Sequence, residues 1–355
     1  MADPSAWRGR RVLVTGHTGF KGSWLCTWLS TMGARVTGYA LDPPTQPNLF
    51  ESAGVAARLA DVRGDIRDAA ATRAALERAD PEVVFHLAAQ PLVRESYRAP
   101  VDTYATNVVG TASVLEACRH APSLRAVVVV TTDKCYENRE WDRGYVETDA
   151  LGGHDPYSNS KACAELVTDS FRRSFFAGRS PIVGLATARA GNVVGGGDWA
   201  DDRLVPDLVR AALSGEEALI RNPGATRPWQ HVLEPLHGYL LLAEALLRDP
   251  AAFSEGWNFG PEAGGDRPVR DVVERFAARW AGRLRWRVDG GEHPHEAGKL
   301  MLDSAKAKAR LGWRSRLGLD ETIALTADWY GAVLSGEGDL AARTEAQVRY
   351  YSALA

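Results

Sequence analysis

Three glycines spaced three residues apart stand between an apolar stretch and a helical pattern near the N-terminus, and no other feature constrains the fold as strongly. Residues 11–14, RVLV, are short and apolar, as expected of a buried strand, and residues 19–33 carry apolar side chains at helical spacing. Gly16, Gly19 and Gly22 occupy the turn between them. Glycine suits this turn because the backbone must reverse tightly there. The pattern predicts a strand, a turn and a helix.

A dinucleotide fits such a turn. The bare backbone can approach a pyrophosphate, which then rests on the N-terminus of the helix. A second strand is predicted at residues 35–41, and Asp42 follows Gly22 by 20 residues at its end. A carboxylate there accepts hydrogen bonds from a ribose diol and repels a 2′-phosphate, which favours NAD over NADP. An ordinary turn between strand and helix is the alternative, but the strand, helix and acid together speak against it.

Further cofactor contacts are expected where the next strands end. Residues 57–68 contain a third short strand ending at Asp65 and Ile66, which are placed to flank an adenine. Residues 82–90, EVVFHLAAQ, form a fourth strand, and the small alanines at its end let a cofactor lie close to the backbone. Together with two residues introduced below, the predicted cofactor-binding residues are Gly16, Gly19, Phe20, Gly22, Asp42, Asp65, Ile66, Leu87, Ala88, Ala89, Asn107, Tyr157 and Lys161.

Two polar residues in this part have structural interpretations. His86 lies in the fourth strand, and we interpret it as a hydrogen-bonded core histidine rather than a ligand. Asn107 lies in a predicted helix at residues 103–118, and we expect it to bridge neighbouring backbone because a buried asparagine must be bonded. Residues 124–130, LRAVVVV, form a fifth buried strand. Alternating strands and helices predict an α/β fold with a doubly wound parallel sheet of Rossmann type, whose ligands bind beyond the carboxyl ends of the strands.

Composition excludes several other classes. The net charge is −3, with acids and bases interspersed, which argues against a nucleic-acid-binding or membrane-surface protein. The four cysteines lack CxxC or metal-ligand spacing, so we expect free thiols in a reducing compartment. There is no apolar run of 18 residues, and the first residues lack the apolar core of a signal peptide. These features predict a soluble, cytoplasmic protein.

Tyr157 and Lys161 are four residues apart, so on a helix they share one face. A Tyr-x-x-x-Lys pair downstream of a dinucleotide turn resembles the short-chain dehydrogenase/reductase superfamily. A phenol has a pKa of about 10. A neighbouring ammonium and a positive nicotinamide would favour the phenolate. Tyr157 would then take the proton of a substrate hydroxyl while its carbon gives hydride to NAD. Thr132, at the end of the fifth strand, would hydrogen-bond the same hydroxyl.

The segment TTDKCYEN, residues 131–138, adds an acid and an amine that hydride transfer does not need. Oxidation of a sugar at C4 makes the C5 hydrogen acidic. A base can then remove that hydrogen while an acid protonates the departing C6 hydroxyl, and hydride returns to C6. Asp133 and Lys134 supply such a pair beside Thr132, which indicates a dehydratase rather than a plain oxidoreductase.

From about Arg11 to Tyr330 the chain resembles the sugar-nucleotide 4,6-dehydratases of the extended short-chain dehydrogenase/reductase group. The most specific stretches are VTGHTGFKGSWL, HLAAQPLVRESY, TTDKCYEN, LGGHDPYSNSKACAEL and RAGNVVGGGDWADDRLVPD. Relatives acting on dTDP- and GDP-sugars typically have Asp-Glu after the threonine, whereas the CDP-glucose branch has Asp-Lys, as here. The resemblance implies conversion of CDP-D-glucose to CDP-4-keto-6-deoxy-D-glucose and water, with NAD as cofactor, Asp133 as the acid toward C6 and Lys134 as the base at C5.

Lys134 raises a physical problem in that role. A free lysine has a pKa of about 10.4 and is protonated at neutral pH, and lowering that value to about 7 requires roughly 4–5 kcal/mol. Burial and the nearby cations Lys161 and nicotinamide could supply this. The alternative is that Lys134 only orients Asp133.

The resemblance also implies the organisation of the chain. We expect an NAD-binding Rossmann domain over residues 1–190 and a lobe mainly for the sugar nucleotide over residues 191–355, with an approximate boundary because the lobe is interwoven with the sheet. Helices at residues 103–118 and 157–176 pair two subunits in this superfamily, which predicts a homodimer or homotetramer. No metal is expected, although His293, His295 and Glu296 could be read as ligands.

Three residues are predicted to hold the sugar nucleotide. Asn192 would act by hydrogen bond, and Arg203 and Arg227 by charge toward phosphate. Trp229 is equally compatible with a substrate contact and with core packing. No residue type independently selects cytosine.

Two other functions share parts of this sequence pattern. Another sugar-nucleotide dehydratase or a 4-epimerase would share the fold, but epimerases generally lack the acid and base after the threonine. A non-catalytic NAD-sensing protein tends to lose the tyrosine or the lysine, and both are present here.

Overall fold

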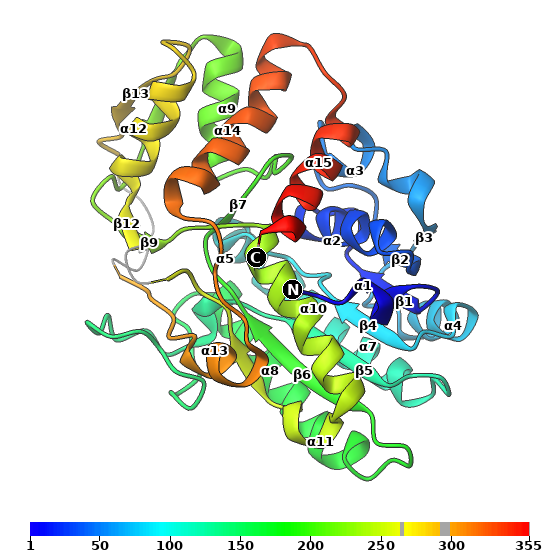
Figure 1. Cartoon of the computed structure of the whole chain (residues 1–355). Coiled ribbons are helices and arrows are strands. Elements are labelled where there is room, and N and C mark those ends of the chain that lie inside the picture. The colour runs from blue at the N-terminus through cyan, green and yellow to red at the C-terminus, as the bar shows by residue number, and fades with distance from the viewer. Residues whose placement is uncertain (263–265, 292–298, 355) are drawn as a thin grey trace.

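A parallel sheet of seven strands forms the centre of the computed structural model, which describes residues 1–262, 266–291 and 299–354 (Figure 1). The strand order is β11-β6-β5-β4-β1-β2-β3, and every neighbouring pair is parallel. The chain starts in the middle and winds outward in both directions, so the predicted doubly wound sheet is confirmed. The strands are β1 (Arg11–Thr15), β2 (Arg35–Ala40), β3 (Ala60–Arg63), β4 (Val83–His86), β5 (Ala126–Val130), β6 (Gly184–Arg189) and β11 (Gly256–Asn258).

The central strands are apolar throughout because both faces of the sheet are covered. Val12 and Val14 of β1 point into one hydrophobic cluster, and Leu13 between them points into the other. One cluster takes in helices α2 (Phe20–Thr31) and α10 (Leu233–Arg248), and the other takes in α4 (Ala69–Ala79) and α7 (Gly110–Arg119). These two clusters are the core on either face of the sheet.

Two helices in the first half of the chain differ from the sequence-based prediction. Residues 22–29 of α2 are buried without exception, because α10 and the C-terminal helix α15 (Leu340–Ala353) both pack against it. The helix predicted at residues 103–118 contains a π-helical turn. The remaining elements before residue 190 are α1 (Pro4–Trp7), α3 (Leu49–Ser52), η1 (Val55–Arg58), α5 (Val93–Arg98), α6 (Pro100–Tyr104), η2 (Ala105–Val109), η3 (Asp133–Cys135), α8 (Pro156–Phe171) and η4 (Arg172–Phe176).

Most elements after residue 190 form a lobe above the carboxyl ends of the strands (Figure 1). Small strand pairs organise it: β7 with β10 and β8 with β13 are parallel, and β9 with β12 is antiparallel. Other elements return to the sheet: β11 forms its edge, α10 packs on β5 and β6, α11 (Pro250–Phe253) packs on β6, and α13 (Ala305–Leu311) packs on β11. The domain boundary at residue 190 stays a prediction. The lobe contains β7 (Val193–Val194), α9 (Leu204–Ser214), β8 (Glu217–Ile220), β9 (Thr226–Pro228), β10 (Gln230–His231), β12 (Asp266–Pro268), α12 (Val269–Arg279), β13 (Arg285–Val288) and α14 (Leu319–Ser335).

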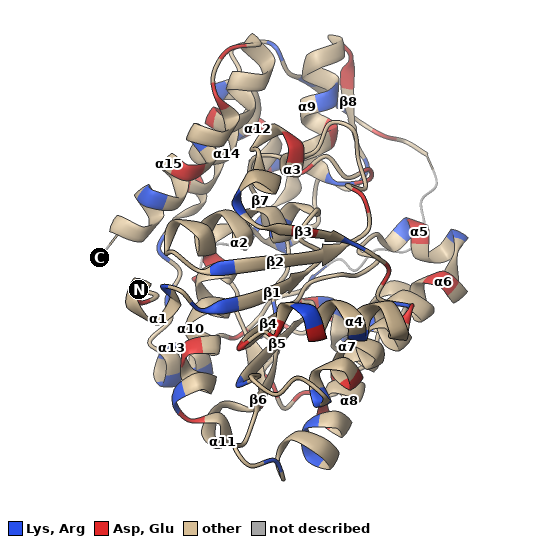
Figure 2. Cartoon of the chain, turned by 90° about the vertical axis from the view of Figure 1, so that its right-hand side faces the viewer, with Lys and Arg blue, Asp and Glu red and all other residues tan. Residues whose placement is uncertain are grey.

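Charged residues of both signs are distributed over the elements in the view of Figure 2. This matches the interspersed acids and bases of the sequence. Among the residues that the structure describes, no helix has the length and apolarity needed to cross a membrane.

Candidate active site

A cavity of about 1140 Å³ lies between the carboxyl ends of the strands and the C-terminal lobe. Sites for a single small ligand usually measure about 300–1,000 Å³, so this cavity has room for two ligands side by side. Its wall combines the glycine turn, the ends of β4 and β5, the start of α8 and the loop that leads into α9. Every predicted site residue except Asn107 lines it.

The glycine turn closes through backbone packing. Gly16 has a φ of +74°, and a Cβ atom there would lie 2.7 Å from the backbone nitrogen of Ala88. A Cβ on Gly22 would lie 2.1 Å from the carbonyl oxygen of Gly16, whereas one on Gly19 would lie at an ordinary 3.4 Å. Helix α2 begins directly after Gly19, so its free N–H groups face the cavity. The turn therefore offers an anion site with no room for side chains at two of its three glycines.

The predicted adenosine contacts form the far wall. Asp42 is 90 % exposed, with its carboxylate 3.6 Å from Arg63. Strand β3 ends at Arg63, two residues earlier than expected, so Asp65 and Ile66 lie in the loop beyond it. A hydrogen bond from Arg67 holds the pKa of Asp65 below its usual value. Both acids thus border the cavity from the loops that follow β2 and β3.

His86 and Asn107 support the wall from behind. The ring nitrogens of His86 lie 2.7 Å from the hydroxyl of Thr15 and 3.0 Å from that of Thr111, which confirms a hydrogen-bonded core histidine. The side chain of Asn107 accepts from the backbone nitrogen of Gln90 at 2.8 Å and donates to its carbonyl at 3.0 Å. The predicted backbone bridge is confirmed, and because Asn107 does not line the cavity, its contact with a cofactor stays a prediction.

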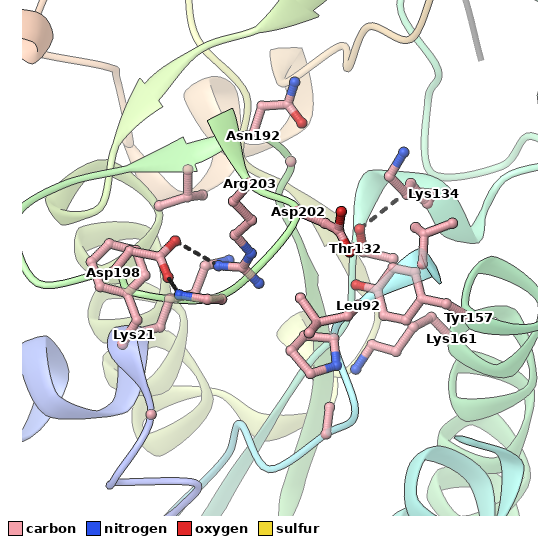
Figure 3. A pocket seen from close by; sticks show the side chains of 18 of the residues that line it. Lys21, Leu92, Thr132, Lys134, Tyr157, Lys161, Asn192, Asp198, Asp202 and Arg203 are labelled. Carbon is pink, nitrogen blue, oxygen red and sulfur yellow. Dashed lines mark hydrogen bonds and ion pairs between the residues drawn. The ribbon is translucent and has the colours of Figure 1, made fainter. Parts of the chain in front are cut away.

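Tyr157 and Lys161 project from the first two turns of α8 into the cavity (Figure 3). Asp155 caps this helix by accepting from the backbone nitrogen of Ser158 at 2.9 Å, and Pro156 follows it. The Nζ of Lys161 donates to the carbonyl of Val130 at 2.8 Å. Burial lowers the pKa of Lys161 to about 8. The amine is therefore anchored to the end of β5.

The pKa of Tyr157 moves opposite to the sequence-based expectation. Burial raises it to about 12, and the hydrogen bond with Thr132 only partly opposes this. The phenol is 9 % exposed, so its anion would lose most of its hydration. The phenol thus needs a positive charge beside it in the cavity to ionise at neutral pH.

Asp133 and Lys134 differ in their surroundings. Asp133 is 2 % exposed, and one of its carboxylate oxygens accepts from the hydroxyl of Thr132 at 2.9 Å. Its other oxygen lies where a Cβ on Gly191 would stand, at 1.7 Å. Lys134 is only half-buried, and its side chain extends away from Tyr157 (Figure 3). Asp133 is thus rigidly placed, while Lys134 lies along the cavity wall.

The predicted substrate residues come from the loops of the lobe. Asn192 has a φ of +44°, and Arg203 donates to Asp198 at 2.8 Å. Arg227 is buried at the cavity wall. Trp229 both lines the cavity and belongs to the core, with its indole nitrogen donating to the carbonyl of Arg267 at 3.0 Å, so both interpretations stay open. His293, His295 and Glu296 lie outside the described residues.

Sequence reasoning missed Lys21, which lies in the glycine turn. Figure 3 places it beside Asp198 and Arg203, across the cavity from Tyr157. Burial, helped by the charge of Arg203, lowers the pKa of Lys21 to about 8. A lysine within a glycine turn was the available signal, since that position faces a pyrophosphate.

A second missed feature is a carboxylate that bridges two arginines. One oxygen of Asp202 lies 3.2 Å from Nη1 of Arg94 and 3.2 Å from Nη1 of Arg221. Arg94 belongs to α5 and Arg221 follows β8, so the bridge joins the two halves of the chain at the cavity. No local pattern could reveal it, because the three residues are distant in sequence.

The arrangement brings a hydroxyl, a phenol, an amine and a carboxylic acid to one end of the cavity and several cations to the other. The first group suits proton movement at a carbon bearing a hydroxyl, and the second suits phosphate groups. The glycine turn between them accepts a further pyrophosphate.

Several known proteins are similar to this chain in sequence or in structure. The chain is 52 % identical to a CDP-glucose 4,6-dehydratase of Salmonella typhimurium over 95 % of both chains. It is 28 % identical to a dTDP-glucose 4,6-dehydratase of Xanthomonas campestris, over 90 % of this chain and 92 % of that one. Among solved structures, MoeE5 in complex with UDP-glucose and NAD matches with a TM-score of 0.74 and 27 % identity, covering 91 % of this chain and 99 % of that one.

A UDP-glucuronic acid 4-epimerase of Bacillus cereus, solved with its substrate and NAD, has a TM-score of 0.77 at 22 % identity, covering 91 % of this chain and 99 % of that one; it shares the fold. The family described as GDP-mannose 4,6 dehydratase matches residues 13–326. The chain therefore belongs to the GDP-mannose 4,6-dehydratase family of the extended short-chain dehydrogenase/reductase superfamily.

Proposed function

We propose that the chain is an NAD-dependent lyase that converts CDP-D-glucose to CDP-4-keto-6-deoxy-D-glucose and water. One observation carries the proposal: a buried carboxylic acid, Asp133, adjoins the Thr132, Tyr157 and Lys161 set at one end of the cavity. The identity of 52 % to a CDP-glucose 4,6-dehydratase, against 28 % to a dTDP-glucose enzyme, supports CDP-glucose over other sugar nucleotides.

The cavity fits NAD. The space beside the glycine turn exists only because Gly16 and Gly22 lack side chains, and the N-terminus of α2 points into it. Gly16, Gly19 and Gly22 would hold the pyrophosphate, and Asp42 the adenosine ribose. When bound, NAD would supply the redox chemistry: it would accept hydride from C4 of the sugar and later return that hydride to C6.

The residues of the chain move the protons. Tyr157 takes the proton of the C4 hydroxyl, and the Thr132 hydroxyl turns from the Asp133 carboxylate, to which it donates in the structure, to donate a hydrogen bond to that oxygen instead. A positive charge in the cavity favours the phenolate, opposing the burial that raises the pKa of Tyr157 to about 12. Lys161 adds its charge from its anchor on the Val130 carbonyl.

Elimination follows oxidation at C4. The new ketone acidifies the C5 hydrogen, which Lys134 removes while Asp133 protonates the departing C6 hydroxyl as water. Lys134 then returns its proton to C5 as C6 gains the hydride, and the proton that Tyr157 took from the C4 hydroxyl restores the acid form of Asp133 through solvent. Asp133 is well suited because its carboxylate is held by Thr132 and packed against Gly191. The alternative role for Lys134, orienting Asp133, is less favoured because the Lys134 side chain extends along the wall (Figure 3).

The cations of the lobe suit the substrate's pyrophosphate. Arg203 and Arg227 line that part of the cavity, and Asn192 is placed for a hydrogen bond. Other sugar-nucleotide dehydratases and 4-epimerases are the runner-up functions. A purely NAD-sensing role would leave Asp133 and Lys134 without use.

We further propose a homodimer in the cytoplasm. Large apolar side chains are exposed on the helices expected to pair, including Val109 and Leu166, which are 55 % and 59 % exposed. The four cysteines are free, which suits a reducing compartment. Sedimentation should give a dimer or larger that Leu166→Glu dissociates; an unchanged monomer for the native chain would contradict this.

The decisive test offers CDP-, dTDP-, GDP- and UDP-glucose in parallel and reads the alkaline absorbance of a 4-keto-6-deoxy product. CDP-glucose should give the fastest product formation, with no net accumulation of reduced nicotinamide. Faster turnover of another nucleotide would assign a different dehydratase, and reduced nicotinamide stoichiometric with substrate would make the protein a plain dehydrogenase.

A further inference from the structure

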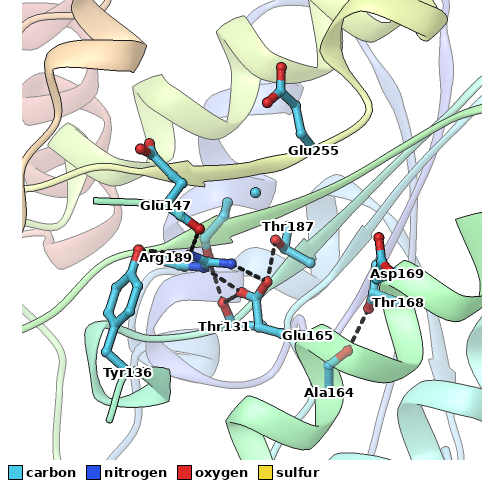
Figure 4. A network of polar contacts seen from close by, with 12 residues as sticks. Thr131, Tyr136, Glu147, Ala164, Glu165, Thr168, Asp169, Thr187, Arg189 and Glu255 are labelled. Carbon is cyan, nitrogen blue, oxygen red and sulfur yellow. Dashed lines mark hydrogen bonds and ion pairs between the residues drawn. The ribbon is translucent and has the colours of Figure 1, made fainter. Parts of the chain in front are cut away.

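A buried ion pair lies directly behind the catalytic segment. Glu165 is on α8, one turn beyond Lys161, and Arg189 is the last residue of β6. Their side chains are 4 % and 5 % exposed. Two parallel bonds join them: Nε to Oε1 at 2.9 Å and Nη2 to Oε2 at 2.8 Å (Figure 4). This is the bidentate geometry that a guanidinium and a carboxylate prefer.

The carboxylate of Glu165 is saturated with donors. The hydroxyls of Thr131 and Thr187 donate to its two oxygens at 2.5 and 2.7 Å. Burial alone would raise the pKa of Glu165, but the charge of Arg189 and the hydrogen bonds from Arg189, Thr131 and Thr187 together outweigh it and hold the pKa below its usual range. The ion pair is therefore fully formed at neutral pH and joins α8 to the ends of β5 and β6.

Arg189 extends the network to the other side. Its Nη1 donates to the hydroxyl of Tyr136 at 2.7 Å and to the carbonyl of Glu147 at 3.3 Å. The Tyr136 hydroxyl in turn donates to Asn258 of β11 at 2.8 Å. The guanidinium also lies over the ring of Tyr136, 5.0 Å from its centre.

Stability alone is a poor reason for such a network. Replacing a buried ion pair by well-packed apolar side chains is often neutral or stabilising. What the network achieves is a clamp on a short segment: Thr131 at its start bonds Glu165, and Tyr136 at its end bonds Arg189. Thr132, Asp133 and Lys134 lie between these two points.

The two ends of the segment are not held equally. The start is also fixed by the β5 ladder and by the bond from Lys161 to Val130. The far end leaves the sheet, and its side-chain hydrogen-bond anchor is the Tyr136 hydroxyl. Beside it, Tyr136 forms an isolated bridge with Leu151, with backbone bonds from Gly152 to Cys135 and from Glu137 to Ala150. Loss of the Tyr136 anchor should thus displace Asp133 and Lys134 more than Thr132.

Resting on the proposed function, we propose that Glu165, Arg189 and Tyr136 are positioning residues that set the geometry of the elimination step, separately from hydride transfer at C4. Tyr136→Phe is the sharpest variant, because it removes one oxygen and leaves the ring in place. Arg189→Lys keeps the charge but loses both the bidentate pair and the reach to Tyr136.

Single-turnover kinetics of the NAD-loaded protein with CDP-glucose separate the steps. Tyr136→Phe should slow loss of the C6 hydroxyl and C5 exchange with deuterium about tenfold or more, the usual size of one lost hydrogen bond to a charged group. Formation of reduced nicotinamide should change by less than about threefold, so it accumulates transiently. Arg189→Lys should likewise slow elimination much more than nicotinamide reduction. The double variant should eliminate no more slowly than the more affected single variant.

Tyr351→Phe is the matched control, since Tyr351 of α15 is another buried tyrosine bonded to a buried glutamate, Glu234 of α10, at 2.7 Å. This variant should lower the melting temperature without changing the rate of elimination relative to the rate of nicotinamide reduction. If Tyr136→Phe and Arg189→Lys slow both steps equally, or neither, the positioning role is wrong. If the native chain makes no 4-keto-6-deoxy product, the proposed function fails, and this inference with it.

Discussion

The glycine turn after β1 and the polar segment after β5 lie at the same edge of one sheet, yet they are held in different ways. The turn is shaped by backbone contacts: Gly22 packs on the carbonyl of Gly16, and the nitrogen of Gly16 donates to the carbonyl of Tyr39 in β2 at 3.0 Å. The segment is shaped mainly by side chains from α8 and β6, with the backbone of Gly191 packed against Asp133.

This difference predicts different responses to mutation. A region built from local backbone contacts fails when a side chain is added, because nothing nearby can move aside. A region built from distant side chains fails when one of their polar atoms is removed. Binding of NAD should depend on the first region, and the chemical steps on the second.

The largest effect is expected for Tyr157→Phe, which removes the base for oxidation at C4. The steady-state rate with CDP-glucose should fall by about 10²–10⁴, the usual size of a lost general base. Affinity for NAD, measured by calorimetry, should change little because the glycine turn is untouched. Full activity in this variant would leave Tyr157 with a structural role only.

Asp133→Asn and Lys134→Met distinguish the roles of the two residues within the segment. Product should fall by about 10²–10⁴ in each, while NAD is still reduced because Thr132 and Tyr157 are intact. Exchange of the C5 hydrogen with deuterium should vanish in Lys134→Met and persist in Asp133→Asn. Exchange at the native rate in Lys134→Met would pass the role of base to Asp133 or another group.

Gly22→Ala attacks the turn and leaves the segment alone. Its Cβ would stand 2.1 Å from the carbonyl of Gly16, and such overpacking typically amounts to about 1–3 kcal/mol. NAD affinity should fall roughly tenfold or more. Gly19→Ala is the matched control, because its Cβ has a contact at 3.4 Å and should be tolerated. Equal losses in both would mean that packing against Gly16 does not shape the turn.

The smallest effect concerns Lys21, whose pKa burial lowers to about 8 from 10.5. Between these values the unfolded chain binds a proton that the folded chain lacks, so the free energy of unfolding rises with pH across that window. Lys21→Met should lose this gain while remaining at least as stable near neutral pH. Melting temperatures of both proteins at pH 7.5 and 9.5 test this; parallel shifts would show that Lys21 titrates normally.

Sequence alone determined the doubly wound sheet, the glycine turn and the shared helical face of Tyr157 and Lys161. Each rests on short-range physics: glycine permits a turn that no other residue can make, parallel strands covered on both faces are apolar throughout, and residues four apart on a helix align. It was also predictable that His86 would form hydrogen bonds within the core, because a buried imidazole must be bonded.

Only the tertiary structure decided the contacts between distant residues. The fit of Asp133 against Gly191, the Asp202 bridge from Arg94 to Arg221 and the Glu165–Arg189 pair join segments that no local spacing connects. The direction of the Tyr157 pKa shift belongs here as well, since it follows from burial by the assembled lobe and helix. The pKa of a side chain depends on its burial and on the charges around it, and both are contributed by segments that come together only in the folded chain.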